Sequence, residues 1–519
     1  MMSVPATRYF RKAIVAACSG ITLALAFPKF ELSWLVFFAL VPIFYISRNE
    51  SGPGAFLLGT IAGFSFNFIA FFWITEAMSN FSDLGFVPSV MVLLLLVAYL
   101  AVYFGILANV ASMIRLNGLS VLVIPALWVA LEFAKSKIIS GFPWNDLSWA
   151  LYRHTTFIQI ADTLGSYGVS FVIVLFNWLL FLMLARFTGD RVEIRITHVL
   201  AVLVLVPLGI YVYGAARLAS LPEPSKTLKV GIIQPSIPQA MKLSGRFMQE
   251  MLDTYQSQAF ELEAKGVKVM LLPEAAINVA YNVRANSQNW VKQTFSDRGC
   301  FVLFGALARE GENYMNSAYV VSPNGETQRY DKVHLVPFGE YIPYSWLLSF
   351  IEAIAGQQGS LSEGTTHAIL QLDGVWVGVP ICYEIIFPEI ARTFVNRGAD
   401  LICTLSNDAW FGKTSGPYQH FAASVFRAIE NRVPVIRCAN SGVSGSVDYR
   451  GIIRLETPIF TRRTDIVEVG IAAQGSVFRV IGSLFAYLCV TCSIVAGVVY
   501  AKRMWSDATK RPHPCGSEA

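Results

Sequence analysis

The sequence predicts a multi-pass α-helical membrane domain joined to an α/β domain outside the membrane. Two bulk properties indicate the membrane part: the mean hydropathy of the 519 residues is +0.51, and only 14% of them are charged. The third observation is that apolar residues gather in long runs before residue 217 and after residue 475. The segment between these runs has the composition of a folded domain with a core of its own.

Eight apolar runs are candidate membrane spans, because a spanning helix needs about 20 predominantly apolar residues. Seven precede the polar segment and one follows it. The second and fifth runs are short, so each is either a thin span or a re-entrant segment. The first run follows basic residues but lacks a clear signal-peptide cleavage site, and we interpret it as a helix. The runs cover residues 13–28, 33–47, 54–75, 87–114, 119–134, 165–185, 196–216 and 477–501.

Basic residues beside the runs predict the orientation. With a cytoplasmic N-terminus, the outside loop at 76–86 holds no basic residue, as the positive-inside rule expects. Exceptions on the outer side are Lys29, Lys135, Lys137 and Arg153. The inner segments hold Arg8, Arg11, Lys12, Arg48, Arg115, Arg186, Arg191, Arg195, Lys502, Arg503, Lys510 and Arg511.

An odd number of preceding spans places the polar segment outside. We predict a membrane domain of about seven helices at 1–216, an extracytoplasmic α/β domain at 217–475, a transmembrane helix at 476–501 and a cytoplasmic tail at 502–519. The eight cysteines suggest neither a disulfide framework nor a zinc site, so no metal or cofactor is expected. The net charge of +5 is modest, which argues against nucleic acid as a partner.

The outer segment contains short β-branched and apolar runs that end in turn residues, a pattern typical of strands. Helical stretches lie between several of them, at 246–265 and 417–431. The second stretch is amphipathic, with Phe421, Val425 and Ile429 on one face. The alternation predicts an α/β domain. The strand-like runs are "TLKVGIIQPS", "VKVMLLPEAAIN", "CFVLFGALARE", "NSAYVVSPNG", "VWVGVPICYEI", "ADLICTLSNDAW" and "PVIRCANSG".

The segment 141–164, which begins "GFPWNDLSWALYRHTTF", is neither a polar loop nor a clean span. Its aromatic residues Trp144, Trp149, Tyr152 and Phe157 suit the lipid headgroup region. The segment is therefore either an interfacial piece or an ordinary membrane anchor, and the residues alone leave both interpretations open.

Three residues at or between the ends of strand-like runs are candidates for chemistry. Cys382 in "VGVPICYEIIFPE" is either a buried core thiol or a nucleophile. Glu274 ends the apolar run "VKVMLLPE", where an unpartnered carboxylate is costly, and Lys332 stands in "YDKVHLVPFGEYIP". Each also has an ordinary interpretation, as a core thiol, a helix cap or a solvated charge. The histidines of the segment lack a persuasive setting at a strand end: His334, His367 and His420.

In order and local context, the Glu of "LLPEAAIN", the Lys of "KVHLVPFGEYIP" and the Cys of "ICYEIIFPE" resemble the Glu-Lys-Cys triad of the nitrilase (carbon-nitrogen hydrolase) superfamily. A nitrilase-like domain between the last two helices of a membrane protein is similar to the apolipoprotein N-acyltransferase family. "GFPW", "IPQAMK" and "LSNDAWFG" extend the resemblance over nearly the whole chain. One position departs, because the family often has tryptophan where this chain has Leu243.

The resemblance implies an αββα sandwich and transfer of a fatty acyl chain from a membrane phospholipid to the α-amino group of an apolipoprotein's diacylglyceryl-modified N-terminal cysteine. It implies ping-pong kinetics through a thioester on Cys382, with Glu274 as the base. Lys332 and the backbone N–H of Tyr383 would hold the oxyanion. The residues expected to support the triad are Glu340, Tyr383 and Glu384, and those expected to line an acyl pocket are Phe338, Trp410 and Phe411.

The resemblance also implies the bacterial inner membrane, with the catalytic domain on the periplasmic side, and flanking helices on one chain favour a monomer. Two other functions remain open from the residues: a membrane-anchored amidase or nitrilase, and an inactive lipoprotein-binding scaffold. A transporter is disfavoured, because the main acidic residues of the apolar runs, Glu76, Glu132 and Asp162, lie near predicted span ends.

Overall fold

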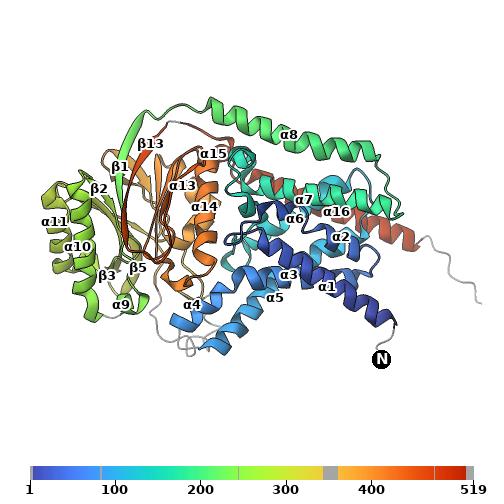
Figure 1. Ribbon diagram of the computed structural model, residues 1–519, viewed down its shortest axis with the longest axis horizontal. Helices are drawn as coiled ribbons and strands as arrows, with labels where there is room; N and C mark the ends of the chain where they lie inside the picture. The colour runs from blue at the N-terminus through green and yellow to red at the C-terminus, as the bar shows by residue number, and fades with distance from the viewer. Residues whose placement is uncertain (1–3, 82–84, 244, 343–360, 473, 510–519) are drawn as a thin grey trace, which may run out of the picture.

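The computed structural model describes residues 4–81, 85–243, 245–342, 361–472 and 474–509. A helical part and an α/β part lie end to end (Figure 1). The helical part combines the N-terminal segments with the last helix, whereas the α/β part comes from the chain between them. The predicted fold class, a helical membrane domain with a nitrilase-like α/β domain, is confirmed.

Five helices are long and apolar enough to cross a membrane among the described residues: Gly52–Phe71, Phe86–Met113, Phe157–Phe187, Ile196–Ser220 and Leu484–Lys502. The other three predicted spans differ for visible reasons. The first carries three basic residues at its start, the run 33–47 breaks into two short helices, and the run 119–134 forms a helix of 16 residues. A total of eight spans therefore stays a prediction.

The helices of this part follow the predicted runs, with one break near the C-terminus. Gly482, with a φ of 56°, separates a short helix from the long last one. The helices are α1 (Val4–Leu25), α2 (Val41–Ser47), α3 (Gly52–Phe71), α4 (Trp73–Phe81), α5 (Phe86–Met113), α6 (Ser120–Lys135), α7 (Ala161–Phe187), α8 (Ile196–Ser220), α15 (Val477–Ile481) and α16 (Leu484–Thr509).

Two β-sheets pack face to face in the α/β part, and helices cover their outer faces (Figure 1). The first sheet has the order β13-β1-β2-β4-β5-β6, with β3 beside β4, and the second has the order β12-β11-β10-β9-β8-β7. α10 covers the first sheet, and α13 and α14 cover the second. This is the αββα sandwich that the resemblance implied.

Each of the seven predicted runs contains a strand, and the additional strands are short or lie at sheet edges. The strands are β1 (Lys226–Gln234), β2 (Val269–Leu271), β3 (Ile277–Ala280), β4 (Phe301–Glu310), β5 (Asn313–Val321), β6 (Thr327–Asp331), β7 (Leu370–Leu372), β8 (Val375–Gly378), β9 (Leu401–Ser406), β10 (Val435–Ala439), β11 (Gly445–Val447), β12 (Ile453–Glu456) and β13 (Arg463–Ile471). The helices are α9 (Gln239–Leu243), α10 (Met248–Ala264), α11 (Ala285–Thr294), α13 (Pro388–Asn396) and α14 (Gly416–Asn431).

Strand periodicity separates the two cores of the sandwich. Val230 and Ile232 of β1 join the large core between the sheets, whereas Ile233 points the other way, into the core under α10. Alternation of this kind follows from the two-residue repeat of a strand. The central strands are buried on both faces, which explains why their sequences read as nearly continuous apolar runs.

The helix predicted at 417–431 is present as α14 (Gly416–Asn431). Phe421, Val425 and Ile429 are buried as expected, but the opposite face of α14 is buried too. That face packs on α7 of the membrane part, and the Glu430 carboxylate accepts a hydrogen bond from the Ser166 N–H at 2.9 Å. Polar residues on this helix therefore face a protein interface and not water.

The aromatic residues of the segment 141–164 pack within the protein. Trp144, Trp149 and Tyr152 are each at most 2% exposed, because the segment lies between the membrane helices and the sandwich. Short 3₁₀ turns replace a continuous helix here. The segment forms the junction of the two parts, and its depth at the lipid headgroups stays a prediction.

Candidate active site

Cys382 opens a tight turn shortly after a buried strand of the second sheet. β8 ends at Gly378, and a 3₁₀ turn covers Cys382–Ile386. The backbone of Cys382 is left-handed, with a φ of 51°, a conformation that costs a non-glycine residue about 1–3 kcal/mol. Strain of this kind persists only where surrounding contacts hold it.

Glu384 holds this turn. Its buried carboxylate accepts hydrogen bonds from the backbone N–H groups of Ile381 at 2.7 Å, Val333 at 2.8 Å and His334 at 3.0 Å. Burial raises the pKa of Glu384 to about 7, while Lys332 and these donors act in the opposite direction. Because Val333 and His334 follow Lys332 directly, one carboxylate ties the turn of the cysteine to the loop of the lysine.

Glu274 lies where the chain leaves the first sheet. β2 ends at Leu271 and β3 begins at Ile277, and the carboxylate belongs to the loop between them. Gly305 of β4 allows this loop to come close, because a Cβ atom there would lie 2.7 Å from the Cα of Glu274. The Nδ2 of Asn316 donates to the Glu274 Oε1 at 2.8 Å and fixes the carboxylate.

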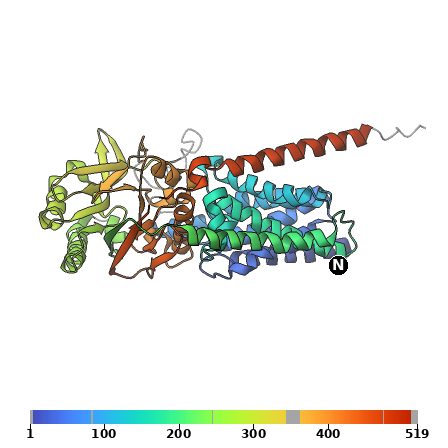
Figure 2. The same ribbon diagram turned by 90° about the horizontal axis from the view of Figure 1, so that it is seen from above.

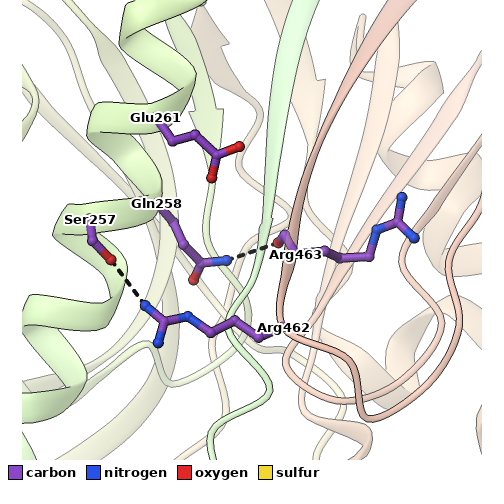
Figure 3. A pocket seen from close by; sticks show the side chains of 5 residues that line it. All are labelled: Ser257, Gln258, Glu261, Arg462 and Arg463. Carbon is purple, nitrogen blue, oxygen red and sulfur yellow. Dashed lines mark hydrogen bonds between the residues drawn. The ribbon is translucent and has the colours of Figure 1, made fainter.

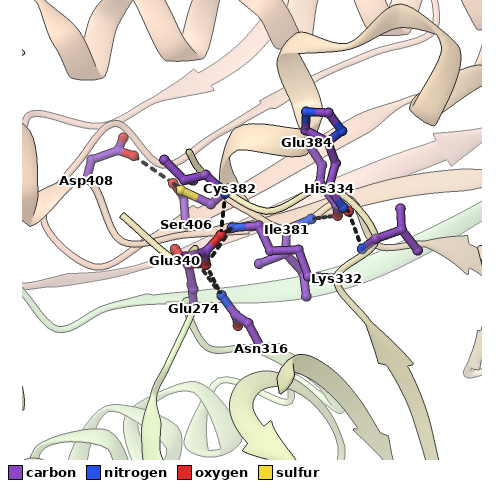
Figure 4. Close-up of polar contacts among 12 residues, drawn as sticks. Glu274, Asn316, Lys332, His334, Glu340, Ile381, Cys382, Glu384, Ser406 and Asp408 are labelled. Atoms are coloured by element: carbon purple, nitrogen blue, oxygen red, sulfur yellow. Dashed lines mark hydrogen bonds and ion pairs between the residues drawn. The ribbon is translucent and has the colours of Figure 1, made fainter. Parts of the chain in front are cut away.

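Lys332 follows β6, and its ammonium group lies beside two carboxylates. Its Nζ is 2.9 Å from Glu340 and 3.7 Å from the Oε1 of Glu274 (Figure 4). Asn316 also donates to Glu340, at 3.0 Å. Burial alone lowers the pKa of Lys332, but Glu340 and Glu274 raise it above its ordinary value. The lysine therefore stays protonated, with its donors fixed by two acids.

The thiol of Cys382 lies next to these groups (Figure 4). Burial raises the pKa of the Cys382 thiol well above its ordinary value and Glu274 raises it further, whereas Lys332 lowers it. The resting thiol of Cys382 therefore keeps its proton. The structure thus brings Glu274, Lys332 and Cys382 together, with Glu340 and Glu384 in contact with the same loops.

A second polar group meets Cys382 from the second sheet. We call it the arginine cluster; it comprises Ser406, Asp408, His420 and Arg437, all buried. His420 lacked a persuasive setting in the sequence, yet its Nε2 lies 3.0 Å from the carbonyl oxygen of Cys382. Asp408 was missed altogether. The usable signal was Arg437, a charged residue in the middle of the strand-like run "PVIRCANSG".

The arginine cluster also bears on whether a metal would fit. One ligand atom each from Cys382, Asp408 and His420 lies within 4.8 Å of the others. Arg437 nevertheless places its Nη2 2.7 Å from the Oδ2 of Asp408 and 2.8 Å from the Nδ1 of His420. A guanidinium that already pairs with the carboxylate and faces the ring nitrogen makes these residues unsuitable for a divalent cation.

Tyr383 connects the turn to the junction segment. Its hydroxyl donates to the carbonyl oxygen of Gly141 at 3.0 Å, and its ring stacks on Trp144 with centroids 6.3 Å apart. Trp144 also packs on the ring of His420, at 5.1 Å, and donates from Nε1 to Gln419 at 3.1 Å. The "GFPW" motif of the membrane part therefore contacts the residues around Cys382.

The three residues predicted to line an acyl pocket lie in different settings. Phe411 packs edge-on against Trp73, with ring centroids 4.5 Å apart, at the junction. Trp410 is half-buried in the turn Asp408–Phe411. Phe338 is 50% exposed, on the loop that follows Lys332. The structure therefore places Phe411 near Trp144 and leaves Phe338 at the surface.

Lys242 is a further buried charge that the sequence did not single out. It belongs to α9, and its Nζ donates to the backbone carbonyl of Glu274 at 2.9 Å. Burial lowers the pKa of Lys242 to about 8, although Glu274 and Cys382 raise it. The side chain of Leu243, where the family often has tryptophan, lies outside the described residues.

One cavity lies near the loop of the lysine. A cavity of about 200 Å³ at the junction is lined by His334 and Phe387, together with residues of α6, α7 and α13. The other, about 330 Å³, lies between α10 and the start of β13 and is lined by Gln258, Arg462 and Arg463 (Figure 3). None of the predicted site residues lines it.

Family comparisons cover most of the chain in two blocks. The model described as the apolipoprotein N-acyltransferase N-terminal domain matches residues 19–179, and the carbon-nitrogen hydrolase model matches residues 229–472. The apolipoprotein N-acyltransferase of Geobacter metallireducens is 35% identical over 504 residues, covering 95% of this chain and 96% of the relative. That of Allorhizobium ampelinum is 30% identical over 475 residues, covering 85% and 87%.

Solved structures resemble the α/β part alone. A CN-hydrolase superfamily protein from Xanthomonas campestris has a TM-score of 0.38 and 19% identity, covering 48% of this chain and 91% of its own. The NitN amidase of a Nesterenkonia species has a TM-score of 0.37 and 19% identity, covering 49% and 95%. Because the sequence relatives match from the membrane helices to the end of the sandwich, the chain belongs to the apolipoprotein N-acyltransferase family.

Proposed function

We propose that this chain carries out its family's acyl transfer through a thioester on Cys382, with Glu274 as the proton acceptor and Lys332 as an oxyanion donor. The transfer takes a fatty acyl chain from a membrane phospholipid to the α-amino group of the diacylglyceryl-modified N-terminal cysteine of an apolipoprotein. The observation that carries the proposal is the convergence of these three side chains from three separate loops, beside membrane helices (Figure 4).

In the first half-reaction, the Glu274 carboxylate takes the thiol proton as the sulfur attacks the ester carbonyl carbon of the phospholipid. The ester oxygen becomes an oxyanion, which Lys332 and the backbone N–H of Tyr383 stabilise. When the carbon–oxygen bond breaks, the lysophospholipid leaves with the proton held by Glu274. A protonated resting thiol fits this order, since proton removal and attack then occur together.

In the second half-reaction, the α-amine of the apolipoprotein attacks the thioester carbon, and Glu274 takes a proton from the nitrogen. The same two donors hold the second oxyanion. The carbon–sulfur bond then breaks, and the sulfur recovers a proton from Glu274. Burial of the site excludes water from the thioester. Hydrolysis of the thioester would otherwise turn the enzyme into a phospholipase.

The supporting residues have separate parts in this mechanism. Glu340 holds the ammonium of Lys332 at 2.9 Å, and Glu384 links the turn of Cys382 to the lysine loop. Tyr383 contributes its backbone N–H, while its side chain contacts the junction. Phe338, Trp410 and Phe411 are proposed to contact the acyl chains, with Phe411 favoured because it lies at the junction.

We further propose the orientation and domain limits given by the charge pattern: 1–216 and 476–501 in the bacterial inner membrane, 217–475 periplasmic and 502–519 cytoplasmic. The N-terminus and the end of α16 lie at the end of the helices away from the sandwich (Figures 1 and 2), which supports this arrangement. Segments that were predicted to be cytoplasmic also contact one another. Arg48 donates to the Ser112 carbonyl, and the Glu193 N–H donates to the Leu116 carbonyl.

Two outer-side exceptions to the charge rule are paired with carboxylates in the folded chain. Lys135 pairs with Asp146 at 2.9 Å, and Arg153 pairs with Glu31 and Glu456. A monomer is proposed because membrane helices of the same chain flank the α/β part on both sides in the sequence.

The decisive experiment incubates the purified chain in detergent with a phospholipid carrying a labelled acyl chain and compares gels with and without neutral hydroxylamine. Wild type is expected to carry label that hydroxylamine removes, and Cys382→Ala is expected to carry none. Cys403→Ala is the matched control, because Cys403 is a buried free cysteine on the neighbouring strand β9.

Label that persists in Cys382→Ala would refute the thioester. Addition of a diacylglyceryl lipopeptide then separates transfer from hydrolysis. Label that moves to the lipopeptide amine supports the acyltransferase, whereas label released as free fatty acid regardless of the lipopeptide supports the membrane-anchored hydrolase.

A further inference from the structure

The sulfur of Cys382 has a hydrogen-bonding neighbour that the mechanism above does not use. The Oγ of Ser406, at the end of β9, lies 3.4 Å from the Cys382 Sγ. The same Oγ lies 2.6 Å from the Oδ1 of Asp408. Ser406 is fully buried, so protein groups alone determine where its hydroxyl proton points.

Counting hydrogens shows that the two contacts compete. A serine hydroxyl has one proton to donate, and both Asp408 and the Cys382 sulfur lie in reach of it. The Nη2 of Arg437, which carries two hydrogens, lies 2.8 and 2.7 Å from the Asp408 oxygens, 2.8 Å from the His420 Nδ1 and 3.0 Å from the Ser406 Oγ. One hydrogen shared between the carboxylate oxygens and one directed at His420 leave the Ser406 Oγ without a donated hydrogen. Arg437 therefore keeps Asp408 satisfied when the serine proton points elsewhere.

The rest of the arginine cluster fixes this geometry. His420 Nε2 lies 3.0 Å from the Cys382 carbonyl oxygen, and Arg437 Nη2 lies 2.8 Å from His420 Nδ1. The Nδ1 also lies 3.1 Å from the Asp408 Oδ1, so the guanidinium and the carboxylate both face it. With its proton on Nε2, a neutral imidazole donates to the Cys382 carbonyl and accepts from Arg437 at Nδ1, while Asp408 pairs with the same guanidinium. Burial and Arg437 lower the pKa of His420, which agrees with the neutral form.

We propose that Ser406 is a further catalytic residue, whose hydroxyl proton turns from Asp408 to the Cys382 sulfur when negative charge develops there. The proton stays on the serine throughout, so no bond of Ser406 forms or breaks. The thiol proton still goes to Glu274, and the sulfur electron pair forms the carbon–sulfur bond. Asp408, His420 and Arg437 act as positioning residues, and the inference rests on Cys382 being the nucleophile.

The charges around the sulfur explain why a second donor is useful there. Lys332 attracts the thiolate from one side, while Glu274 and Asp408 repel it. Lys242, His420, Arg437 and the turn's own Glu384 are further charged or titratable groups around it. Arg437 offsets the negative charge of Asp408. The neutral hydroxyl of Ser406 can therefore donate a hydrogen bond to the sulfur from this side without adding a positive charge that would bind Glu274.

The test measures the rate at which iodoacetamide alkylates Cys382, followed on the Cys382 peptide by mass spectrometry, in the full-length protein in detergent across alkaline pH. The rate follows the thiolate fraction. Ser406→Ala is expected to slow alkylation about tenfold at each pH below the thiol pKa, because a hydrogen bond to a charged group contributes more than a neutral one. Ser424→Ala is the matched control, since Ser424 is buried with no partner for its Oγ.

A second pair of variants removes the effect of cavity size. Ser406→Thr and Ser406→Val have the same shape and differ in the hydroxyl, so Thr is expected to be alkylated about tenfold faster than Val. Equal rates for Ser406→Ala and wild type, or for Thr and Val, would overturn the inference. Failure of the proposed function is distinct, because Cys382→Ala would then still transfer acyl groups.

Discussion

The two polar groups on either side of Cys382 differ in charge balance. Glu274, Lys332 and Glu340, from the first sheet's loops, combine two carboxylates with one ammonium, so they hold a negative charge that can accept a proton. In the arginine cluster the charges of Asp408 and Arg437 cancel. In the proposed mechanism these are two tasks around one sulfur: the first group exchanges protons, and the second orients Cys382.

Position in the fold matches this division. Glu274 and Lys332 lie on loops beyond the ends of their strands. Ser406 and Arg437 are residues of central strands, and His420 lies on α14, packed between the sheet and the membrane part. A group built on strands and a buried helix loses stability when one charge is removed, whereas a loop group loses activity.

The largest expected effect is on activity, from Glu274→Gln. The side chain keeps its shape and its acceptor for Asn316 but no longer takes a proton, so acylation of Cys382 should slow about a thousandfold. Single-turnover transfer from a labelled phospholipid measures this rate. Glu310→Gln, at the exposed end of β4, is the control and should leave it unchanged. A loss below tenfold would remove Glu274 as the base.

The second prediction concerns stability. Asp408→Asn leaves the guanidinium of Arg437 buried without its carboxylate, which should lower the free energy of unfolding by about 3–5 kcal/mol. Thermal unfolding in detergent, with Glu274→Gln measured alongside, provides the contrast. Similar melting temperatures for the two variants would contradict the claim that the arginine cluster contributes more to stability than Glu274 does.

The third prediction uses Lys242. Its pKa of about 8 in the folded chain lies below the ordinary value of 10.5, so between these pH values the unfolded chain binds one more proton than the folded chain. Stability from this group therefore rises as pH increases through that window, by up to about 3 kcal/mol. Lys242→Met should flatten the rise in thermal unfolding measurements. An unchanged slope would show that folding does not lower the pKa of Lys242.

The smallest effect is expected from Trp144→Phe. The ring contacts with Tyr383 and His420 remain, but the Nε1 donor to Gln419 is lost, which should cost about 1 kcal/mol. Transfer should fall only a few-fold, as measured by the single-turnover assay. Trp376→Phe, on the exposed side of β8, should change neither stability nor rate. A drop as large as that of Glu274→Gln would mean that the junction contacts substrate directly.

The triad was within reach of the sequence because each member ends or interrupts a strand-like run. Local pattern left an ordinary interpretation open for each of Glu274, Lys332 and Cys382, and the order of their motifs, which matches the family, singles them out. His420 and Trp144 were out of reach, since their roles depend on packing between the two parts of the molecule. No periodicity predicts that the polar face of α14 will meet another helix.

The span count illustrates the same limit. Length and hydropathy identify α3, α5, α8 and α16 directly, because lipid-exposed helices must be apolar around most of their surface. The run 33–47 is as apolar as a span but breaks into two short helices, held by contacts such as the Asn177 amide against the Val36 carbonyl. Tertiary contacts of this kind leave no mark on hydropathy.

The burial of α14 on every side has a consequence for expression of fragments. A recombinant fragment limited to residues 217–475 would expose the face of α14 that packs on the membrane part. That face holds Gln419, which accepts a hydrogen bond from Trp144, the Arg427–Glu430 pair and the apolar residues between them. Such a face drives self-association in a soluble protein. The α/β part is therefore expected to aggregate as an isolated fragment, because only contact with the membrane helices covers this face of α14.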